Sequence, residues 1–362
     1  MTLIEASDDQ PEFLTHPSIE VLWDEEREDG IKVTHLHVPD ISDGSPGREF
    51  TQARVDMLDN ILKEHPEWEA PKIINGRLVK AEMNPVSAEL YSSEALQEWR
   101  TKLVPTAAAL ANLYHPDELR LASKKVEDDG SLFGGIEIDG PTHDFFVNGL
   151  DAIAIRTRAH IMKMVTEQHA TNKSEHWVSL ACGAAIPVFE AIDGRDGVKL
   201  DLVDLDQDIL EVAERLASEQ GLIAGEDFTT HRESLLRLIT GDEALVDKLG
   251  RENADFVDLI GIVEYFQKKA AVPLLKNAYK MVKPGGSLVF ANMLSTRPQL
   301  DLNQRGIGWP GIFPRSLDEI IDLVEDAELR RDAIVNVYIP EDQIYAVIDI
   351  HKKDELENDD VY

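Results

Sequence analysis

The sequence predicts an α/β protein built on a mostly parallel sheet of seven strands. Beyond residue 148, short β-branched apolar runs alternate with amphipathic stretches, which is typical of a parallel sheet covered by helices on both faces. The last two runs, DAIVNVYIP and QIYAVIDIHK, are separated only by Glu341-Asp342, so they predict an antiparallel hairpin at one edge. Residues 1–147 are mainly helical in pattern and carry no catalytic signature, which predicts an N-terminal cap.

The cap, residues 1–147, is expected to shape the substrate region. Residues 1 to about 50 are polar and acidic, and they predict an extended arm with one strand at 31–38. Apolar residues recur at helical spacing from Ser45 to His65, which predicts a helix. A second helix is predicted from about Ser93 to Tyr114, and Pro116 is suited to open a third, short one.

Residues 148–353 are expected to form the sheet domain, and 354–362 an acidic tail. Asn148–Gln168 predicts one amphipathic helix. Five strands are then predicted in the runs HWVSLAC, VKLDLVD, FTTHRES, DFVDLIGI and GSLVFANM, mostly with helices between them. A helix at Ser316–Ala327 precedes the hairpin.

Charge and cysteine content exclude several kinds of protein. The 362 residues carry 36 Lys and Arg against 69 Asp and Glu, a formal net charge of −33. This excess argues against nucleic-acid and anionic-membrane partners, because both attract clustered basic side chains. The single cysteine, Cys182, excludes an intramolecular disulfide framework and a Cys-rich metal site. Since the sequence has no visible signal peptide or long apolar span, the chain is expected to be cytoplasmic.

The segment SLACGAAIP, residues 179–187, lies where a predicted strand ends and a helix begins. A tight turn of small residues at that point lets backbone N–H groups approach a ligand closely. Asp204 follows Gly183 by about 20 residues and ends the next predicted strand, where an acidic side chain can accept hydrogen bonds from both ribose hydroxyls. The sequence therefore predicts a nucleoside site at the carboxyl ends of two neighbouring strands.

Over roughly residues 150–351 the chain resembles the class I S-adenosylmethionine-dependent methyltransferases. HWVSLACGAA resembles the family's first motif, LVDLDQDIL the second, HRESLL the third and DFVDLIGIVEYF the fourth, and the Pro-Gly-Gly turn and closing hairpin match the family's C-terminal elements. The resemblance implies a Rossmann-like sheet that binds S-adenosylmethionine, with S-adenosylhomocysteine as product. It implies these cofactor contacts: Ala181, Cys182 and Gly183 in the first motif, Asp204 at the ribose, Leu205 beside the adenine, Glu233 or Ser234 near the adenine amine, and Gly261 and Ile262 at the sulfonium.

The first motif departs from the family's usual form. Ser179 stands where an acidic residue is usual, and Ala181 and Ala185 replace the first and last glycines. Alanine tolerates positive φ poorly, so the loop geometry is expected to differ slightly. The missing carboxylate puts the usual contact to the methionine end in doubt. Arg156 or Arg158, just before the first strand, could pair with the cofactor's carboxylate instead, and a surface arginine pair is the alternative.

Catalytic candidates are few. His143 and Asp144 in GPTHDFF could act as general bases, but a loop histidine and a helix N-cap are the favoured interpretation. Cys182 is expected to be a small buried residue at the cofactor rather than a nucleophile. Asp255 and Asp258 have no third carboxylate at ligand spacing, so no metal site is expected.

Four residues are expected to line the substrate pocket. Glu264 follows the fourth strand together with Tyr265, a further catalytic candidate, and simple packing at a helix start is the alternative for both. Asn292 ends a later strand, and Trp309 and Phe313 lie in the loop 306–316. The two aromatic side chains form either a pocket wall or a plug in the core.

The function expected from the resemblance is in-line methyl transfer from S-adenosylmethionine to a small-molecule acceptor. Alignment of the reactants is the main requirement and supplies ~7–11 kcal/mol in favourable cases. A non-catalytic cofactor-binding or interaction module of the same fold and an aminopropyl-type transferase are the alternatives. The identity of the acceptor atom and the oligomeric state, with a homodimer among the choices, stay open.

Overall fold

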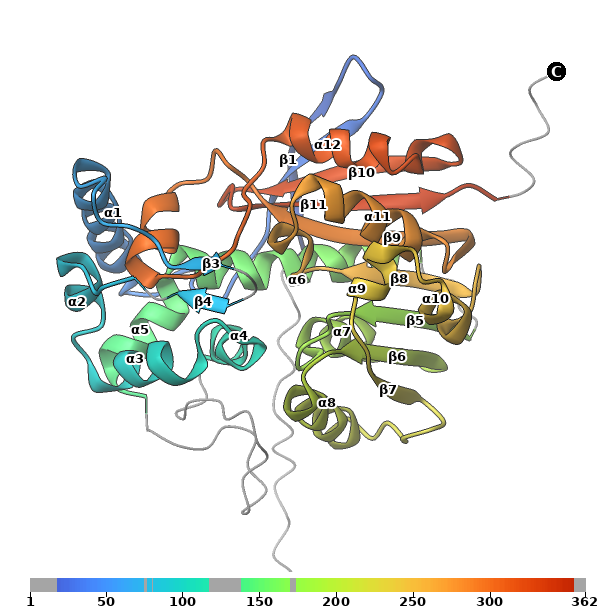
Figure 1. Cartoon of the computed structure of the whole chain (residues 1–362), viewed down its shortest axis with the longest axis horizontal. Coiled ribbons are helices and arrows are strands. Elements are labelled where there is room, and N and C mark those ends of the chain that lie inside the picture. Colours follow the sequence, from blue (N-terminus) through green and yellow to red (C-terminus); the bar gives the residue numbers. More distant parts are fainter. Residues whose placement is uncertain (1–17, 75–76, 80, 117–137, 170–173, 355–362) are drawn as a thin grey trace, which may run out of the picture.

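One nine-stranded sheet forms the centre of the molecule (Figure 1). The computed structural model describes residues 18–74, 77–79, 81–116, 138–169 and 174–354. The sheet runs in the order β1-β2-β10-β11-β9-β8-β5-β6-β7. Its strands are β1 (Glu20–Glu26), β2 (Lys32–His37), β5 (Glu175–Leu180), β6 (Val198–Asp204), β7 (Phe228–Arg232), β8 (Ala254–Leu259), β9 (Val282–Met293), β10 (Ala333–Pro340) and β11 (Tyr345–Lys352).

Seven of these strands, β5 to β11, are those predicted from the apolar runs. Counted from β5 as the first, their spatial order is 3-2-1-4-5-7-6. Strands β5 to β9 are parallel, and β11 is antiparallel to both β9 and β10. The predicted hairpin is therefore present. Its predicted place at an edge is wrong, because β10 pairs on its other side with β2.

The expected count of seven strands in the sheet is wrong, because an N-terminal hairpin adds β1 and β2 to it. Strand β2 lies within the predicted strand at 31–38 and pairs parallel with β10, while β1 pairs antiparallel with β2. The turn between them is closed by a hydrogen bond from Gly30 N–H to the carbonyl of Arg27 at 2.9 Å. Every residue of β1 is exposed, including Trp23, so no buried face produces the alternation that marks a strand in a sequence.

Helices cover both faces of the sheet, as predicted. On one face lie α6 (Leu150–Gln168), α7 (Ile186–Ile192) and α8 (Gln207–Glu219). On the other lie α9 (Leu236–Thr240), α10 (Ala244–Leu249), α11 (Lys268–Tyr279) and α12 (Leu317–Asp326). Each layer encloses its own hydrophobic core. Throughout the described ranges, no helix combines the length and the apolar character needed to cross a bilayer.

The cap packs beside the sheet around a third hydrophobic core (Figure 1). It consists of α1 (Arg48–Glu64), the hairpin β3 (Lys72–Ile74) and β4 (Arg77–Val79), α2 (Pro85–Leu90), α3 (Glu94–Glu98), the π-helical segment η1 (Trp99–Leu103), α4 (Ala107–Tyr114) and α5 (Gly140–Asn148). The π-helical segment η3 (Leu302–Ile307), from the sheet domain, completes this core.

Two of the expected cap helices can be compared with the structure. The helix predicted over 45–65 is present as α1. The one predicted over 93–114 is divided, because Pro105 separates η1 from α4. The third helix, expected from Pro116, and residues 355–362 of the expected acidic tail lie outside the described residues.

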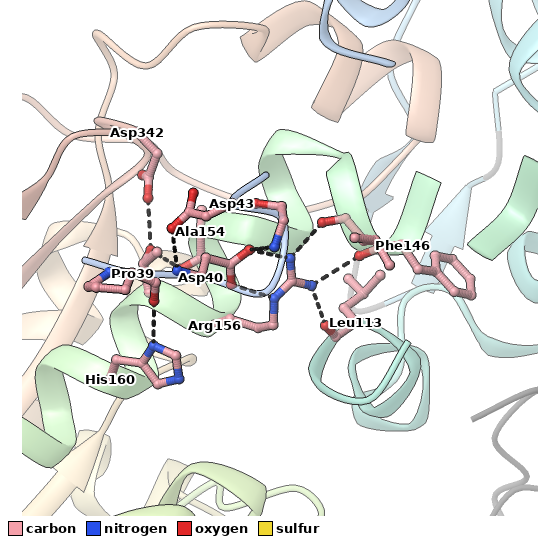
Figure 2. A network of polar contacts seen from close by, with 12 residues as sticks. Pro39, Asp40, Asp43, Leu113, Phe146, Ala154, Arg156, His160 and Asp342 are labelled. Atoms are coloured by element: carbon pink, nitrogen blue, oxygen red, sulfur yellow. Dashed lines mark hydrogen bonds and ion pairs between the residues drawn. The ribbon is translucent and has the colours of Figure 1, made fainter. Parts of the chain in front are cut away.

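A buried ion pair fixes the N-terminal arm to α6 (Figure 2). Arg156 is only 4% exposed, and its Nε and Nη2 donate to the two carboxylate oxygens of Asp40 at 2.7 and 2.8 Å. Burial alone would raise the pKa of Asp40, but its hydrogen bonds to Arg156 lower it. The same guanidinium donates to the carbonyls of Leu113, Phe146 and Val147 at 2.7–3.0 Å. Arg156 thus ties the arm and the ends of α4 and α5 together.

Candidate functional site

The loop between β5 and α7 turns tightly beyond the carboxyl end of β5. Ala181, Gly183 and Ala185 all have positive φ, at 56°, 57° and 56°. The two alanines hold this left-handed conformation at a cost of roughly 1–2 kcal/mol each. A Cβ atom on Gly183 would lie 3.0 Å from Cβ of Ala107 in α4, so a larger residue would collide with the cap.

Asp204, at the end of β6, is held against this loop by backbone hydrogen bonds. Its Oδ2 accepts the N–H of Gly183 and its Oδ1 the N–H of Asp206, each at 2.9 Å. Burial raises the pKa of Asp204. A carboxylate oxygen can accept more than one hydrogen bond, so both oxygens keep capacity for a ligand.

A pocket opens over the Gly183 loop, at the carboxyl ends of β5, β6 and β8. We call it the sheet-edge pocket. It encloses about 1000 Å³ of empty space, part of it open to solvent. The sheet domain contributes Ser179, residues 181–188, Asp204, Asp258, residues 260–262 and Tyr265, and the cap contributes residues 105–107, Leu110, Ala111 and Tyr114; Arg158 and Trp309 complete the lining.

Six of the residues predicted at the cofactor meet in the sheet-edge pocket: Ala181, Cys182, Gly183, Asp204, Gly261 and Ile262. Burial raises the pKa of the Cys182 thiol, which fits a packing residue better than a nucleophile. Leu205 lies outside the lining and is 63% exposed. Glu233 and Ser234 also lie outside it, and the Glu233 carboxylate is paired with Lys248 at 2.9 Å.

The proposed role of Arg156 at the cofactor is wrong, because its guanidinium is fully used by Asp40 and three carbonyls outside both pockets. Arg158 faces the site instead. It is 3% exposed, its Nη1 lies 3.6 Å from Oε1 of Glu264, and its guanidinium lies over the ring of Tyr345 at 4.6 Å. Its Nε has no hydrogen-bond partner among the described residues. A buried arginine with an unpaired donor is suited to bind an anionic group.

Asp258 brings a carboxylate to the place where the first motif lacks one. In the parallel pair of β5 and β8, Asp258 is the register partner of Ser179, and both line the sheet-edge pocket. Burial raises the pKa of Asp258 to about 7. Sequence reasoning rejected Asp258 as a metal ligand in favour of a residue that caps or faces the edge of its strand, and did not place it at the cofactor. Aligning the ends of the runs WVSL and FVDL as neighbouring parallel strands would have placed it there.

A second pocket lies under the cap and meets the first. This cap pocket has about 690 Å³ of empty space, part of it open to solvent. It shares Leu110, Arg158, Gly261, Tyr265 and Trp309 with the sheet-edge pocket. The rest of the cap-pocket lining comes from two parts of the chain. The cap contributes residues of α1, η1, α4 and α5. The sheet domain contributes residues of α6, β9, β11, η3, the segment after β8 and the loop after η3.

Of the predicted substrate-pocket residues, Glu264 and Trp309 line the cap pocket, together with Tyr265. The indole Nε1 of Trp309 donates to the hydroxyl of Tyr265, which fixes both rings at the shared wall. Burial raises the pKa of Tyr265 and of Glu264. The two expectations for Trp309, pocket wall and core residue, both hold, since its ring also packs in the cap core.

Four other candidates lie away from both pockets. Asn292 is buried in β9 and its Oδ1 accepts from Arg315. Phe313 lies in a shallow depression beside η2 (Val263–Tyr265) and is partly exposed. His143 and Asp144 lie within α5, whose N-cap is Asp139. In the described part of the chain, no three His, Cys, Asp or Glu side chains are arranged to hold a metal ion.

Comparison with known proteins gives matches only among solved structures. No family model matches the chain, and no curated protein does. A possible exported protein from Bordetella parapertussis matches with 17% identity over 87% of this chain and 99% of its own, at a TM-score of 0.56. At that identity the match shows a shared fold.

Several further matches carry methyltransferase names, among them the two that follow. The S-adenosylmethionine-dependent methyltransferase SibL matches at 13% identity over 82% of this chain and 84% of its own, with a TM-score of 0.46. Magnesium protoporphyrin IX methyltransferase from Synechocystis, with S-adenosylhomocysteine bound, matches at 12% identity over 61% of this chain and 90% of its own, with a TM-score of 0.44. Both are likenesses of fold at low sequence identity.

Proposed function

We propose that this protein is an S-adenosylmethionine-dependent methyltransferase that acts on a small-molecule acceptor. The observation that carries the proposal is the pair of adjoining pockets, one over the Gly183 loop and Asp204 and the other under the cap. A transferase needs such an arrangement, because donor and acceptor must meet in line in a site that excludes water. The net charge of −33 favours a small acceptor over a nucleic acid.

The sheet-edge pocket offers a partner for each part of S-adenosylmethionine. The carboxylate of Asp204 has capacity left for ribose hydroxyls, and the exposed apolar side chain of Leu205 beside it would cover the adenine. At the other end, Asp258 would pair with the ammonium group and Arg158 with the carboxylate of the amino acid part. When bound, the cofactor supplies an electrophilic methyl group on a sulfonium centre.

The remaining work falls to the chain's own residues. Leu110 of α4 lines both pockets, and Trp309 and Tyr265 stand at their shared wall. These side chains exclude water and fix the direction from which an acceptor can approach. An aligned near-attack geometry in a dry pocket is the main contribution that the protein makes to in-line transfer.

Substituting Asp204→Ala should weaken binding of S-adenosylhomocysteine and of 5′-methylthioadenosine alike, by ~1–3 kcal/mol, because both ligands carry the ribose. Isothermal titration calorimetry measures both affinities. The exposed Asp242→Ala serves as the matched control and should bind both ligands as the unchanged protein does. Failure of the unchanged protein to bind S-adenosylhomocysteine would remove the proposed function.

Substituting Arg158→Met should weaken binding of S-adenosylhomocysteine by roughly 1.5–3 kcal/mol but leave 5′-methylthioadenosine unaffected, because the latter lacks the amino acid end. The same calorimetry compares the two ligands, with the half-exposed Arg237→Met as control. Equal losses for both ligands would mean that Arg158 supports the pocket without touching the amino acid end.

Incubation with trideuteromethyl cofactor and a metabolite extract then tests methyl transfer. Binding of the cofactor without any labelled product would favour the non-catalytic alternative.

A further inference from the structure

Two residues that line the cap pocket each carry a buried oxygen atom that has no hydrogen-bond partner within the described ranges. The atoms are Oε2 of Glu264, a residue 2% exposed, and Oδ1 of Asn303, a residue 4% exposed. The Asn303 amide cannot be turned over to exchange its atoms, because its Nδ2 donates to Asp151 at 3.0 Å. An unpaired buried acceptor costs ~1–3 kcal/mol. Both oxygens therefore favour a ligand that carries a hydrogen-bond donor.

The rest of the cap pocket fits an apolar ligand body. The carboxylate of Asp151 in its lining is already paired with Arg297 and accepts a hydrogen bond from the Asn303 amide. Arg158 lies against Glu264 and would also pair with the carboxylate of the cofactor, so it is not free to pair with an acidic acceptor. Most of the remaining lining is aromatic or aliphatic, including Trp99, Leu113, Phe145, Ile155, Leu302 and Ile307. Flat apolar molecules with one or two O–H or N–H groups match this lining.

Glu264 lines the cap pocket and lies in the chain between Gly261 and Tyr265, which line both pockets. It follows Gly261, which stands in the wall between the pockets, and its backbone carbonyl is fixed by the N–H of Phe313 at 2.7 Å. Burial raises the pKa of Glu264, which makes its carboxylate a stronger base than one on the surface. The guanidinium of Arg158, 3.6 Å away, favours the charged form that can accept a proton.

We infer that the acceptor is a largely apolar aromatic alcohol or amine, and that Glu264 is the general base that removes the proton from its reacting group. This inference rests on the proposed function. In an alcohol acceptor the O–H bond breaks, its proton passes to Oε2 of Glu264, and the electron pair stays on the oxygen as the nucleophilic pair. In an amine acceptor the nitrogen lone pair is the nucleophilic pair, and the N–H proton passes to Oε2 of Glu264 once the new bond has formed. In both, the nucleophilic pair forms the new bond to the methyl group, the pair of the broken sulfur–carbon bond stays on sulfur, and the proton later leaves Glu264 for water.

A matched series of naphthalenes tests the acceptor class. Binding of 2-naphthol, 2-naphthylamine, 2-methoxynaphthalene and 2-naphthoic acid is measured in the presence of S-adenosylhomocysteine. The hydroxyl and amine probes should bind at least ~10-fold more tightly than the methoxy probe, which cannot donate. In Glu264→Met this preference should shrink several-fold. Equal binding of hydroxyl and methoxy probes, tightest binding of the acid, or no binding of either donor at millimolar concentration would overturn the inference.

Proton transfer to Glu264 has a readout that does not depend on methyl transfer. Excited 2-naphthol is a strong acid, so next to a base it emits at the longer wavelength of the naphtholate. The bound probe should emit as naphtholate in the unchanged protein and as neutral naphthol in Glu264→Gln, which keeps the shape and loses the base. Identical emission from the two proteins would overturn the assignment of Glu264. Because S-adenosylhomocysteine binding is measured separately, a failure here is distinguishable from a failure of the proposed function.

Discussion

The affinity for S-adenosylhomocysteine, divided by that for 5′-methylthioadenosine, should fall at least ~10-fold between about pH 7.5 and about pH 5.5. The reason is Asp258, whose pKa is raised to about 7 by burial. Only its ionised carboxylate attracts the ammonium group, and that form is lost as the pH falls below 7. Asp204 contacts the part that both ligands share, so its own titration cancels in their ratio. Calorimetry across this range measures the ratio directly.

The variant Asp258→Asn supplies the control. It should bind S-adenosylhomocysteine weakly at every pH and so remove the pH dependence. The substitution should weaken binding but increase the stability of the ligand-free fold. A carboxyl group whose folded pKa lies above its unfolded value of 3.8 destabilises the fold when it ionises, so the cost is absent below about pH 4 and complete above about pH 7. The ligand-free variant should therefore be more stable at about pH 8, by at most roughly 4 kcal/mol. A variant that retained the pH dependence would contradict the role of Asp258.

Replacing Arg156 by methionine should lower the free energy of unfolding by about 3–5 kcal/mol, because it leaves Asp40 charged and unpaired in the interior. Three backbone carbonyls also lose their donor. Urea denaturation followed by circular dichroism measures the change. Since the guanidinium lies outside both pockets, the folded variant should bind S-adenosylhomocysteine with unchanged affinity.

Two further proteins complete that experiment. The double variant Asp40→Leu with Arg156→Met should recover part of the lost stability, since it no longer buries an unpaired charge. The exposed Arg237→Met should change stability by less than about 0.5 kcal/mol. A loss below about 1 kcal/mol for Arg156→Met would mean that water reaches Asp40 and that the ion pair does not secure the arm.

The core of the fold could be predicted because each strand from β5 to β11 carries a local pattern. Apolar runs mark buried parallel strands, and the short Glu341-Asp342 connection permits only a hairpin. Strand β1 has no such pattern, since its hydrogen bonds to β2 form it without burial of one face. Asp29-Gly30 between the two strands was an available turn signal. No local pattern reveals that β2 continues the sheet beside β10, because that contact joins distant parts of the chain.

The Gly183 loop and Asp204 could be located from the sequence because they mark the ends of two strands that follow each other in the chain, β5 and β6. The two arginines could not be told apart. Arg156 and Arg158 are both buried on α6, and only the surrounding elements decide that the first binds the arm and the second faces the pockets. The roles of Asp258 and Glu264 could not be predicted either. The role of Asp258 depends on the register between two strands, and that of Glu264 depends on a cap whose packing the sequence does not specify.

The pairing of β2 with β10 has a consequence for synthesis on the ribosome. The two strands are separated by about 300 residues, so the first hairpin emerges long before its partner strand exists. During that interval an unpaired strand edge is open to association with other nascent chains. The acidic residues Glu20, Asp24, Glu25 and Glu26 give β1 a strong negative charge, so mutual repulsion between copies should oppose that association until β10 has been synthesised.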